Sequence, residues 1–196
     1  TEVDRRRLAF RVEVRDELDE AGKGTHERFI IDGAQRLPRL EDKLKRAHGR
    51  AWCDHAFFIG ATTENAAALG ALVLLPGCCG VKIFMGSSTG TLLVADDAAL
   101  EQVLLHTRRR CAVHAEDEFR LRERLTIAQE GGHPRFHPKW RDETAALNAT
   151  RRIVALARKT GHPVHVLHIS TAEEMTFLAQ HKDIATVEAT PQHLTL

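Results

Sequence analysis

The sequence predicts an α/β protein whose strands form a parallel sheet. From residue 51 onward, short apolar segments with strand character alternate with helical patterns, which is the order of elements in parallel sheets. The 196 residues are 43% hydrophobic and 28% charged, as in globular proteins large enough to bury a core. Single polar residues also interrupt several of the apolar segments. An open doubly wound sheet and part of a (β/α)8 barrel both fit these observations.

The first half of the alternation contains three expected strands, at residues 51–60, 80–85 and 111–115. The Ala- and Leu-rich residues 64–75 lie between the first two and end at Pro76-Gly77, a pair that stops helices. Asp96 or Asp97 can cap the next helix. Its apolar positions on one face are Leu100, Val103 and Leu104.

The second half adds two strands, at residues 163–169 and 185–189. Acidic residues after the third strand open a helix through Leu121 and Leu125, and a longer helix follows that ends at Gly161. Ser170 or Thr171, with acidic residues three positions later, forms a capping box for the last helix. Loop 131–137 leads into the long helix. With the residues after it, this loop either shapes a pocket rim or packs as an aromatic loop.

The first fifty residues differ from the rest in their charge. They contain 13 Lys+Arg and 11 Asp+Glu, and only residues 40–47 show clear helical spacing. We expect a solvated helix or a loose arm here. The predicted division is therefore a charge-rich segment of unknown role at 1–39, followed by the α/β part of the chain at 40–196.

Composition excludes several classes of partner. The formal net charge is +1, which favours neither nucleic acid nor an anionic membrane. The longest apolar run, residues 66–75, is about half of the roughly 20 residues that a membrane-spanning helix needs. The first ten residues lack the apolar core of a secretory signal. The four cysteines include an adjacent pair and no CxxC motif, so we expect the protein to be located in the reducing cytoplasm.

Three polar residues on successive expected strands are the candidate site. They are Lys82, His114 and His168. Because side chains alternate along a strand, His114 should share a face with Ala112, and His168 with Val164 and Val166. By the same reasoning Lys82 should lie on the face of Phe84, and His165 should face the outer helices. In a barrel, functional groups gather where strands end, and the two histidines lie there.

Such a trio suggests a metal site. Neutral imidazoles are good Zn²⁺ ligands, whereas an ammonium group is not a ligand. A buried lysine with a lowered pKa can instead add carbon dioxide and become a carbamate, an anionic ligand able to bridge two metals. Each residue also has a structural explanation, as half of an ion pair or as a satisfied polar side chain. No GxGxxG or GxxxxGK[ST] motif follows a strand, and the serines of the loop at residues 86–90 lack the GxSxG pattern of a serine hydrolase.

Four motifs, GVKIFMGSSTG, AVHAEDE, HVLHISTAEEM and VEATPQHLTL, together resemble the bacterial dihydroorotases of the amidohydrolase superfamily. More distantly they resemble allantoinases and dihydropyrimidinases, and the similarity runs from about residue 40 to residue 196. The resemblance implies that residues 40–196 are the central part of a metal-dependent (β/α)8 TIM barrel of the amidohydrolase type. It also implies the activity of the family, which closes carbamoyl aspartate to dihydroorotate in pyrimidine synthesis. It also implies that Lys82 is the carboxylated, metal-bridging lysine and that His114 and His168 complete the coordination of one metal.

The sequence departs from that family at both ends. No HxH pair occurs, and the chain stops at Leu196, before the last strand and its catalytic aspartate. No catalytic or substrate-binding residue is therefore assigned, and at most one Zn²⁺ is expected. An unclosed barrel exposes strand edges, so we expect a homo-oligomer.

The alternatives to a dihydroorotase are an allantoinase or dihydropyrimidinase, or a catalytically inactive dihydroorotase-like structural partner of aspartate transcarbamoylase. If the protein is one of these enzymes, we expect it to bind a small-molecule substrate.

Overall fold

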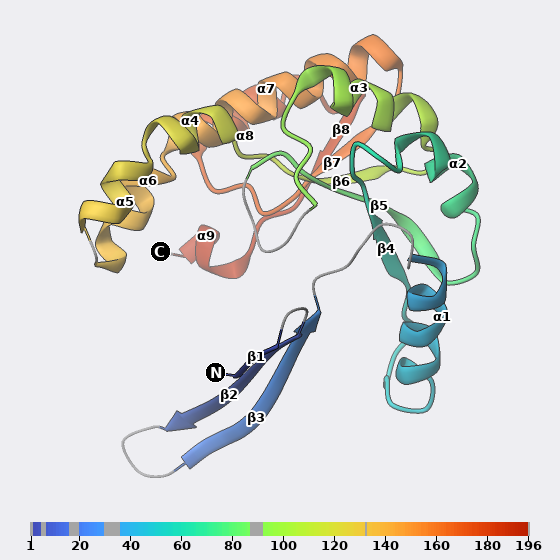
Figure 1. Cartoon of the computed structure of the whole chain (residues 1–196). Coiled ribbons are helices and arrows are strands. Elements are labelled where there is room, and N and C mark those ends of the chain that lie inside the picture. The colour runs from blue at the N-terminus through green and yellow to red at the C-terminus, as the bar shows by residue number, and fades with distance from the viewer. Residues whose placement is uncertain are drawn as a thin grey trace. The chain divides into compact units, whose positions relative to one another are not determined.

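The computed structural model describes residues 2–4, 7–15, 20–29, 36–86, 92–131 and 133–195. The chain divides into two compact units, residues 1–36 and residues 37–196 (Figure 1). No helix in these described ranges is both long and apolar enough to cross a membrane.

The first unit is an antiparallel sheet. Its strands are β1 (Glu2–Asp4), β2 (Arg7–Arg15) and β3 (Glu20–Phe29), in the order β1-β2-β3. For these three strands the expectation of a solvated helix or a loose arm was wrong, whereas the helical spacing at residues 40–47 is confirmed by α1 (Arg36–Ala47). Within β2, apolar residues recur at every second position, from Leu8 to Val14, which is the period of a strand. The dense charges between them concealed this alternation.

The second unit is built on a five-stranded parallel sheet, β4-β5-β6-β7-β8, in which every strand neighbours the next one along the chain. An open doubly wound sheet reverses its strand order at a switch point, whereas a barrel adds strands in sequence. The observed strand order therefore matches part of a barrel and not a doubly wound sheet. The strands are β4 (Phe57–Gly60), β5 (Cys78–Phe84), β6 (Cys111–His114), β7 (Val164–Val166) and β8 (Ala185–Val187).

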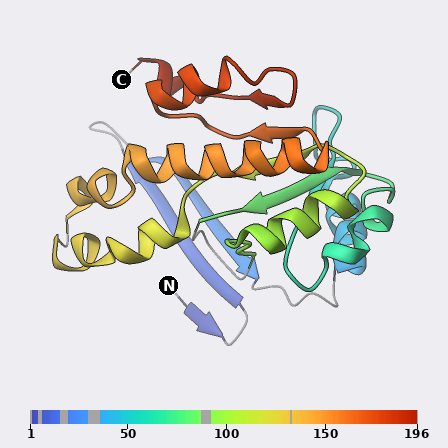
Figure 2. The ribbon, with the colours of Figure 1, turned by 90° about the horizontal axis from the view of Figure 1, so that it is seen from above.

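Helices connect these strands, and α3 and α7 lie side by side along the sheet (Figure 2). The helical segments are α1 (Arg36–Ala47), η2 (Ala66–Ala68), α2 (Leu69–Leu72), α3 (Asp97–His106), α4 (Glu118–Glu123), α5 (Leu125–Gly131), η3 (Pro134–Phe136), α6 (His137–Trp140), α7 (Glu143–Thr160), α8 (Ala172–Leu178) and α9 (Pro191–Thr195).

The helix signals in the sequence are borne out at three ends. Asp96 caps α3 by accepting a 2.8 Å hydrogen bond from the backbone N–H of Ala99. Thr171 caps α8, accepting from the N–H of Glu174 and donating to its carboxylate. Gly161 ends α7 in the left-handed conformation, with φ of 69°.

Several elements are shorter than the sequence predicts. The strand expected at 51–60 begins only at Phe57, because the neighbouring strand β5 starts at Cys78 and offers no earlier pairing partner. The Phe57 N–H donates to the carbonyl of Gly77, the residue before β5. The helix expected at 64–75 consists of the short segments η2 and α2.

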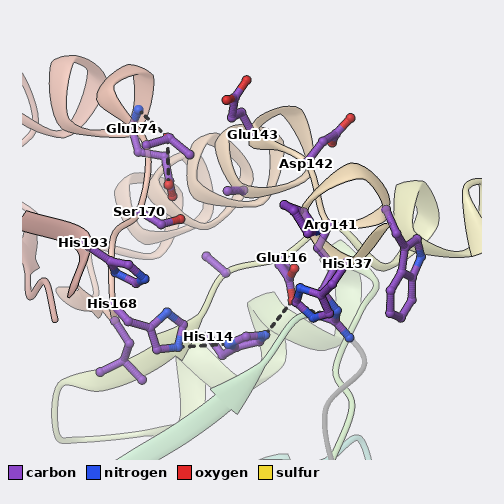
Figure 3. Close-up of a pocket in the computed structure, with 16 residues that line it drawn as sticks. His114, Glu116, His137, Arg141, Asp142, Glu143, His168, Ser170, Glu174 and His193 are labelled. Atoms are coloured by element: carbon purple, nitrogen blue, oxygen red, sulfur yellow. Dashed lines mark hydrogen bonds and ion pairs between the residues drawn. The ribbon is translucent and has the colours of Figure 1, made fainter. Parts of the chain in front are cut away.

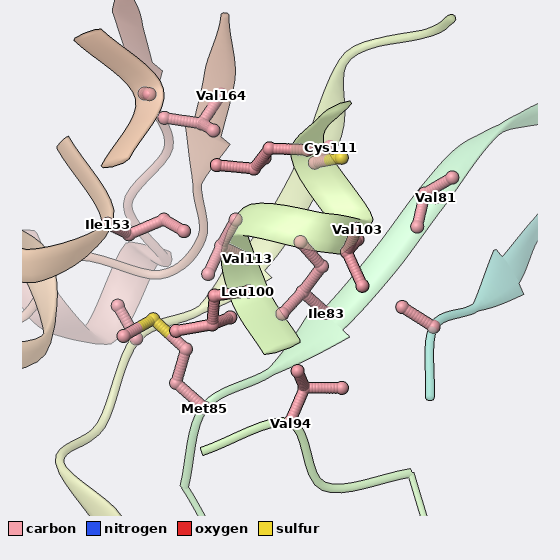
Figure 4. Close-up of a cluster of buried hydrophobic side chains, with 14 of the residues drawn as sticks. Val81, Ile83, Met85, Val94, Leu100, Val103, Cys111, Val113, Ile153 and Val164 are labelled. Carbon is pink, nitrogen blue, oxygen red and sulfur yellow. The ribbon is translucent and has the colours of Figure 1, made fainter. Parts of the chain in front are cut away.

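The core lies between the sheet and its helices. Val81, Ile83 and Cys111 are fully buried there with Val113 and Val164, beneath Leu100 and Val103 of α3 and Ile153 of α7 (Figure 4). Because alternate residues of each strand face this core, Lys82, Ala112 and His165, which are neighbours in the strand register, lie on the opposite face. The placement of His165 toward the outer helices was therefore wrong. Val164 and Val166 take the core positions, since burying branched apolar side chains there is favourable.

Candidate metal centre

Three strands carry the predicted site residues at or near their carboxyl ends. Lys82 lies within β5, His114 is the last residue of β6, and His168 follows β7 by two residues. In parallel β/α barrels this end of the sheet carries the chemistry. His114 and His168 come together there (Figure 3).

The two imidazoles are in direct contact. His114 Nδ1 lies 3.0 Å from His168 Nε2, and the ring centroids are 4.9 Å apart. Two nitrogens bound to one tetrahedral Zn²⁺ at about 2.0–2.1 Å would be separated by roughly 3.3 Å. The observed spacing thus suits a hydrogen bond between the two rings and comes close to the spacing of two ligands on one cation.

His168 reaches this position because the backbone leaves the strand. Its φ of 41° is the only positive value among the described non-glycine residues. The prediction that His168 shares a face with Val164 and Val166 was wrong, because strand alternation ends at Val166 and the left-handed turn redirects the side chain. Such strained conformations persist where surrounding contacts hold them, and they cluster at functional sites.

Glu116 and Arg141 extend the pair of histidines. His114 Nε2 lies 2.9 Å from Glu116 Oε2, and Arg141 Nη1 donates to the same oxygen. Burial by itself would raise the pKa of Glu116, but the hydrogen bond from His114 and the charge of Arg141 outweigh it and hold this pKa below its usual value. The Glu116 side chain is therefore a carboxylate at neutral pH.

Burial lowers the pKa of His168, and the nearby charges of His114 and Lys82 lower it further. His168 is thus neutral near pH 7, which is the protonation state in which an imidazole binds a metal.

Lys82 lies beside this pair on the same face of the sheet. Its Nζ is 4.4 Å from the centroid of the Phe84 ring, and Phe84 is the register partner of His114. Burial lowers the pKa of Lys82 to about 8, against an opposing effect of Glu188. A substantial fraction of the amine is then neutral near pH 7.5, as addition of carbon dioxide requires.

Among the described residues, no group of three His, Cys, Asp or Glu side chains is arranged to hold a metal ion. A carboxylated Lys82 would add an anionic oxygen donor to the two imidazole nitrogens. The donor set therefore fits Zn²⁺ when Lys82 carries a carbamate.

A cavity of about 870 Å³ opens beside the two histidines. Loop residues after β6 and β7 line it together with residues of four helices. These helix and loop residues include His137, Pro138, Trp140, Arg141, Glu174 and His193. His137, Pro138 and Trp140 thus form part of a pocket wall, one of the two roles left open for the loop and the residues that follow it.

The sequence alone missed Glu116, Arg141 and His193. A signal for Glu116 was present, since it lies two positions after His114 at a strand end. Arg141 lies 25 residues from Glu116, and no local pattern joins the two.

Comparison with known proteins agrees with this architecture. The chain is 28% identical over 185 residues to a dihydroorotase of Methanosarcina mazei, covering 85% of this chain and 40% of that protein. It is 29% identical over 165 residues to an allantoinase of Deinococcus radiodurans, covering 80% of this chain and 37% of that protein. The solved D-hydantoinase from Bacillus sp. AR9 superimposes with a TM-score of 0.73 at 25% identity, covering 85% of this chain and 38% of that one.

The parallel-sheet unit has the fold of part of a cyclic amidohydrolase barrel, and we name it the amidohydrolase unit after this similarity. The chain spans about two fifths of the length of the relatives it matches. In the amidohydrolase unit, the His114–His168 pair and the cavity lie at the barrel end where the loops follow the strands.

Residues 1–34 match a different family, described as FlK, fluoroacetyl-CoA-specific thioesterase. This match coincides with the antiparallel unit and stops before the amidohydrolase unit begins.

Proposed function

We propose that the amidohydrolase unit contributes one Zn²⁺ site to a metal-dependent cyclic amidohydrolase. Its ligands are His114, His168 and a carboxylated Lys82. The observation that carries the proposal is the 3.0 Å separation of His114 Nδ1 and His168 Nε2 at the carboxyl ends of adjacent strands. A bound Zn²⁺ would polarise an amide carbonyl and lower the pKa of a bound water.

The chain's own residues prepare this site. The lowered pKa of Lys82 makes its amine available for carbon dioxide, and the resulting carbamate is anionic. His168 is neutral and can direct a lone pair at the cation. The cavity beside the pair has room for a small cyclic substrate, since small-molecule sites in proteins measure about 300–1,000 Å³.

For the substrate we propose dihydroorotate, with ring closure of carbamoyl aspartate as the reverse reaction. The dihydroorotases of Methanosarcina mazei and Methanosarcina acetivorans support this choice, as do the four sequence motifs. The alternatives are an allantoinase or hydantoinase activity, supported by the relatives of those names. A catalytically inactive structural partner of aspartate transcarbamoylase is a third possibility.

Metal analysis tests the site. We expect the chain, purified in the presence of bicarbonate, to hold close to one equivalent of zinc, and ¹³C-bicarbonate to give a carbamate resonance in its ¹³C NMR spectrum. Lys82→Ala should abolish the resonance and the zinc. Zinc-free wild-type protein under these conditions would refute the proposed metal site.

Substrate assays separate the candidate activities. We expect a whole protein containing this unit to hydrolyse dihydroorotate faster than allantoin or hydantoin. Preference for either of the other two rings would reassign the substrate, and turnover of none of them would favour the structural partner.

We further propose that the chain self-associates in a cytoplasmic setting. β4 and β8 are the edges of the described sheet, and unpaired edge backbone promotes association. All four cysteines are free thiols, as a reducing compartment maintains them. Sedimentation equilibrium should give a mass above 21.9 kDa. A monomer at micromolar concentration would contradict the association.

For the antiparallel unit we propose an origin in a thioesterase-type domain, independent of the amidohydrolase unit. The family match at residues 1–34 supports this proposal. Removing residues 1–36 should then leave zinc binding by the remaining residues unchanged. Loss of zinc binding from a truncated chain that still folds would show that the two units depend on each other.

A further inference from the structure

Glu116 lies next to the proposed metal-binding nitrogens of His114 and His168 but is not one of the proposed ligands. Its Oε2 lies 2.9 Å from the far nitrogen of His114, while the near nitrogen faces His168. A carboxylate can only accept a hydrogen bond. His114 Nε2–H therefore donates to Glu116, and the lone pair of His114 remains on Nδ1, toward His168.

Arg141 holds Glu116 in this orientation. Its guanidinium donates to the same oxygen, and both side chains are more than four-fifths buried, with 18% and 14% exposure. On its other side, Arg141 lies over the Trp140 ring, 4.5 Å from the centroid. Trp140 is itself anchored, because its indole N–H donates a 2.7 Å hydrogen bond to the Leu121 carbonyl in α4. Arg141 thus connects the helical side of the cavity to the end of β6.

The backbone around Glu116 leaves it little freedom. Gly86, just after β5, lies so close that a Cβ there would be 2.6 Å from Glu116 Cβ and 2.9 Å from its carbonyl oxygen. The next residue, Asp117, donates its N–H to Ala145 in α7. The carboxylate therefore meets His114 from a fixed direction.

We infer that Glu116, oriented by Arg141, is a positioning residue that keeps His114 in the Nε2-protonated tautomer with Nδ1 free to bind a cation. This inference rests on the proposed function, because the tautomer of His114 matters only if His114 binds a metal. The tautomer itself is a property of the metal-free chain. Partners that orient a metal-binding histidine commonly contribute 10–100-fold to metal affinity.

The first test reads the tautomer without metal. In ¹⁵N-histidine-labelled wild-type chain, two-bond ¹H–¹⁵N correlation spectra should show His114 protonated at Nε2 alone. Glu116→Gln should give a mixture of tautomers, because an amide can donate as well as accept. Asp183→Asn breaks the Arg158–Asp183 ion pair, whose residues do not line the cavity, and should leave His114 unchanged. A wild-type His114 protonated at Nδ1, or an unchanged tautomer in Glu116→Gln, overturns the inference.

The second test measures affinity for Co²⁺, followed by its ligand-field absorption. We expect Glu116→Gln to weaken binding about 10–100-fold. Arg141→Lys should lose less affinity than Arg141→Met, because the lysine retains a charge for Glu116. Thermal denaturation in the presence of a chelator reports stability separately.

The two tests separate the inference from the proposed function. Variants that melt earlier yet bind Co²⁺ as tightly as wild type overturn the inference, because Glu116 and Arg141 would then be structural only. A wild-type chain that binds no Co²⁺ overturns the proposed metal site, and the tautomer of His114 then decides the inference alone.

Discussion

Thr150 and Glu174 join helices α7 and α8 through a buried hydrogen bond. Thr150 Oγ1 donates to Glu174 Oε1 at 2.7 Å, and the two residues are 0% and 2% exposed. The other carboxylate oxygen accepts from Thr171, the residue that caps α8. A carboxylate inside the protein is thus satisfied by two hydroxyl groups, and the segment that follows His168 is tied to the longest helix of the unit.

We expect Thr150→Val to destabilise the protein by about 1–3 kcal/mol, because it removes one donor from a buried carboxylate without changing the side-chain volume much. Urea denaturation followed by circular dichroism measures the difference. Thr176→Val is the matched control, since Thr176 is exposed and its hydroxyl only donates to a carbonyl of its own helix. Equal effects of the two substitutions would contradict the importance of the Thr150–Glu174 hydrogen bond.

Gly86→Ala should destabilise the chain by about 1–3 kcal/mol, because the added methyl group would overlap the Glu116 side chain and carbonyl. The displaced Glu116 should also weaken Co²⁺ binding. Gly161→Ala serves as the control. Its Cβ would meet no atom within 4 Å, so only the positive φ opposes it and metal binding should be unaffected. Full Co²⁺ affinity in Gly86→Ala would show that this close approach does not hold Glu116.

Asp142 makes stability depend on acid pH. Hydrogen bonds from Arg120, at 2.7 and 2.5 Å, lower the pKa of Asp142 below its ordinary value. A carboxyl group whose pKa is lower in the folded state stabilises the protein above its unfolded pKa of about 3.8, and this contribution disappears as the pH falls through the lowered value.

Asp142→Asn should therefore cost up to about 1 kcal/mol at pH 7, since the pair is partly exposed and asparagine still caps α7. The difference from wild type should shrink below pH 4. Urea denaturation between pH 3 and pH 7 measures it. A constant difference over this range would mean that the carboxylate charge is not what stabilises the fold.

The four cysteines should react at two different rates. Cys53 and Cys79 are exposed, whereas Cys78 and Cys111 are buried, and burial raises the pKa of Cys111 to about 12. Because the thiolate is the reactive form, we expect a disulfide reagent to label Cys53 and Cys79 in the native chain and the other two only after unfolding. Mass spectrometry of the labelled peptides identifies the sites. Rapid native labelling of Cys111 would contradict the packing of β6 against the helices.

Local sequence signals were sufficient to predict many of the secondary-structure elements in the amidohydrolase unit. Caps such as Asp96 and Thr171 and the stop at Gly161 act through bonds to residues within a few positions, so a sequence displays them directly. Strand lengths were less predictable, because a strand needs a partner at the same level, as the late start of β4 shows. In the antiparallel unit, the strong alternation in β2 was available but was hidden by charge.

In the amidohydrolase unit, the sequence itself determined the order of strands and helices, the helix ends at Asp96, Thr171 and Gly161, and the strands that carry Lys82, His114 and His168. Each of these features depends on neighbours along the chain. Only the tertiary structure decided that His168 turns out of its strand onto His114, that His165 lies opposite the core, and that Arg141 reaches Glu116. These outcomes depend on a positive φ, on which face the helices cover, and on a contact across 25 residues. All three depend on contacts between segments that lie far apart in the sequence, and a local sequence pattern does not encode such contacts.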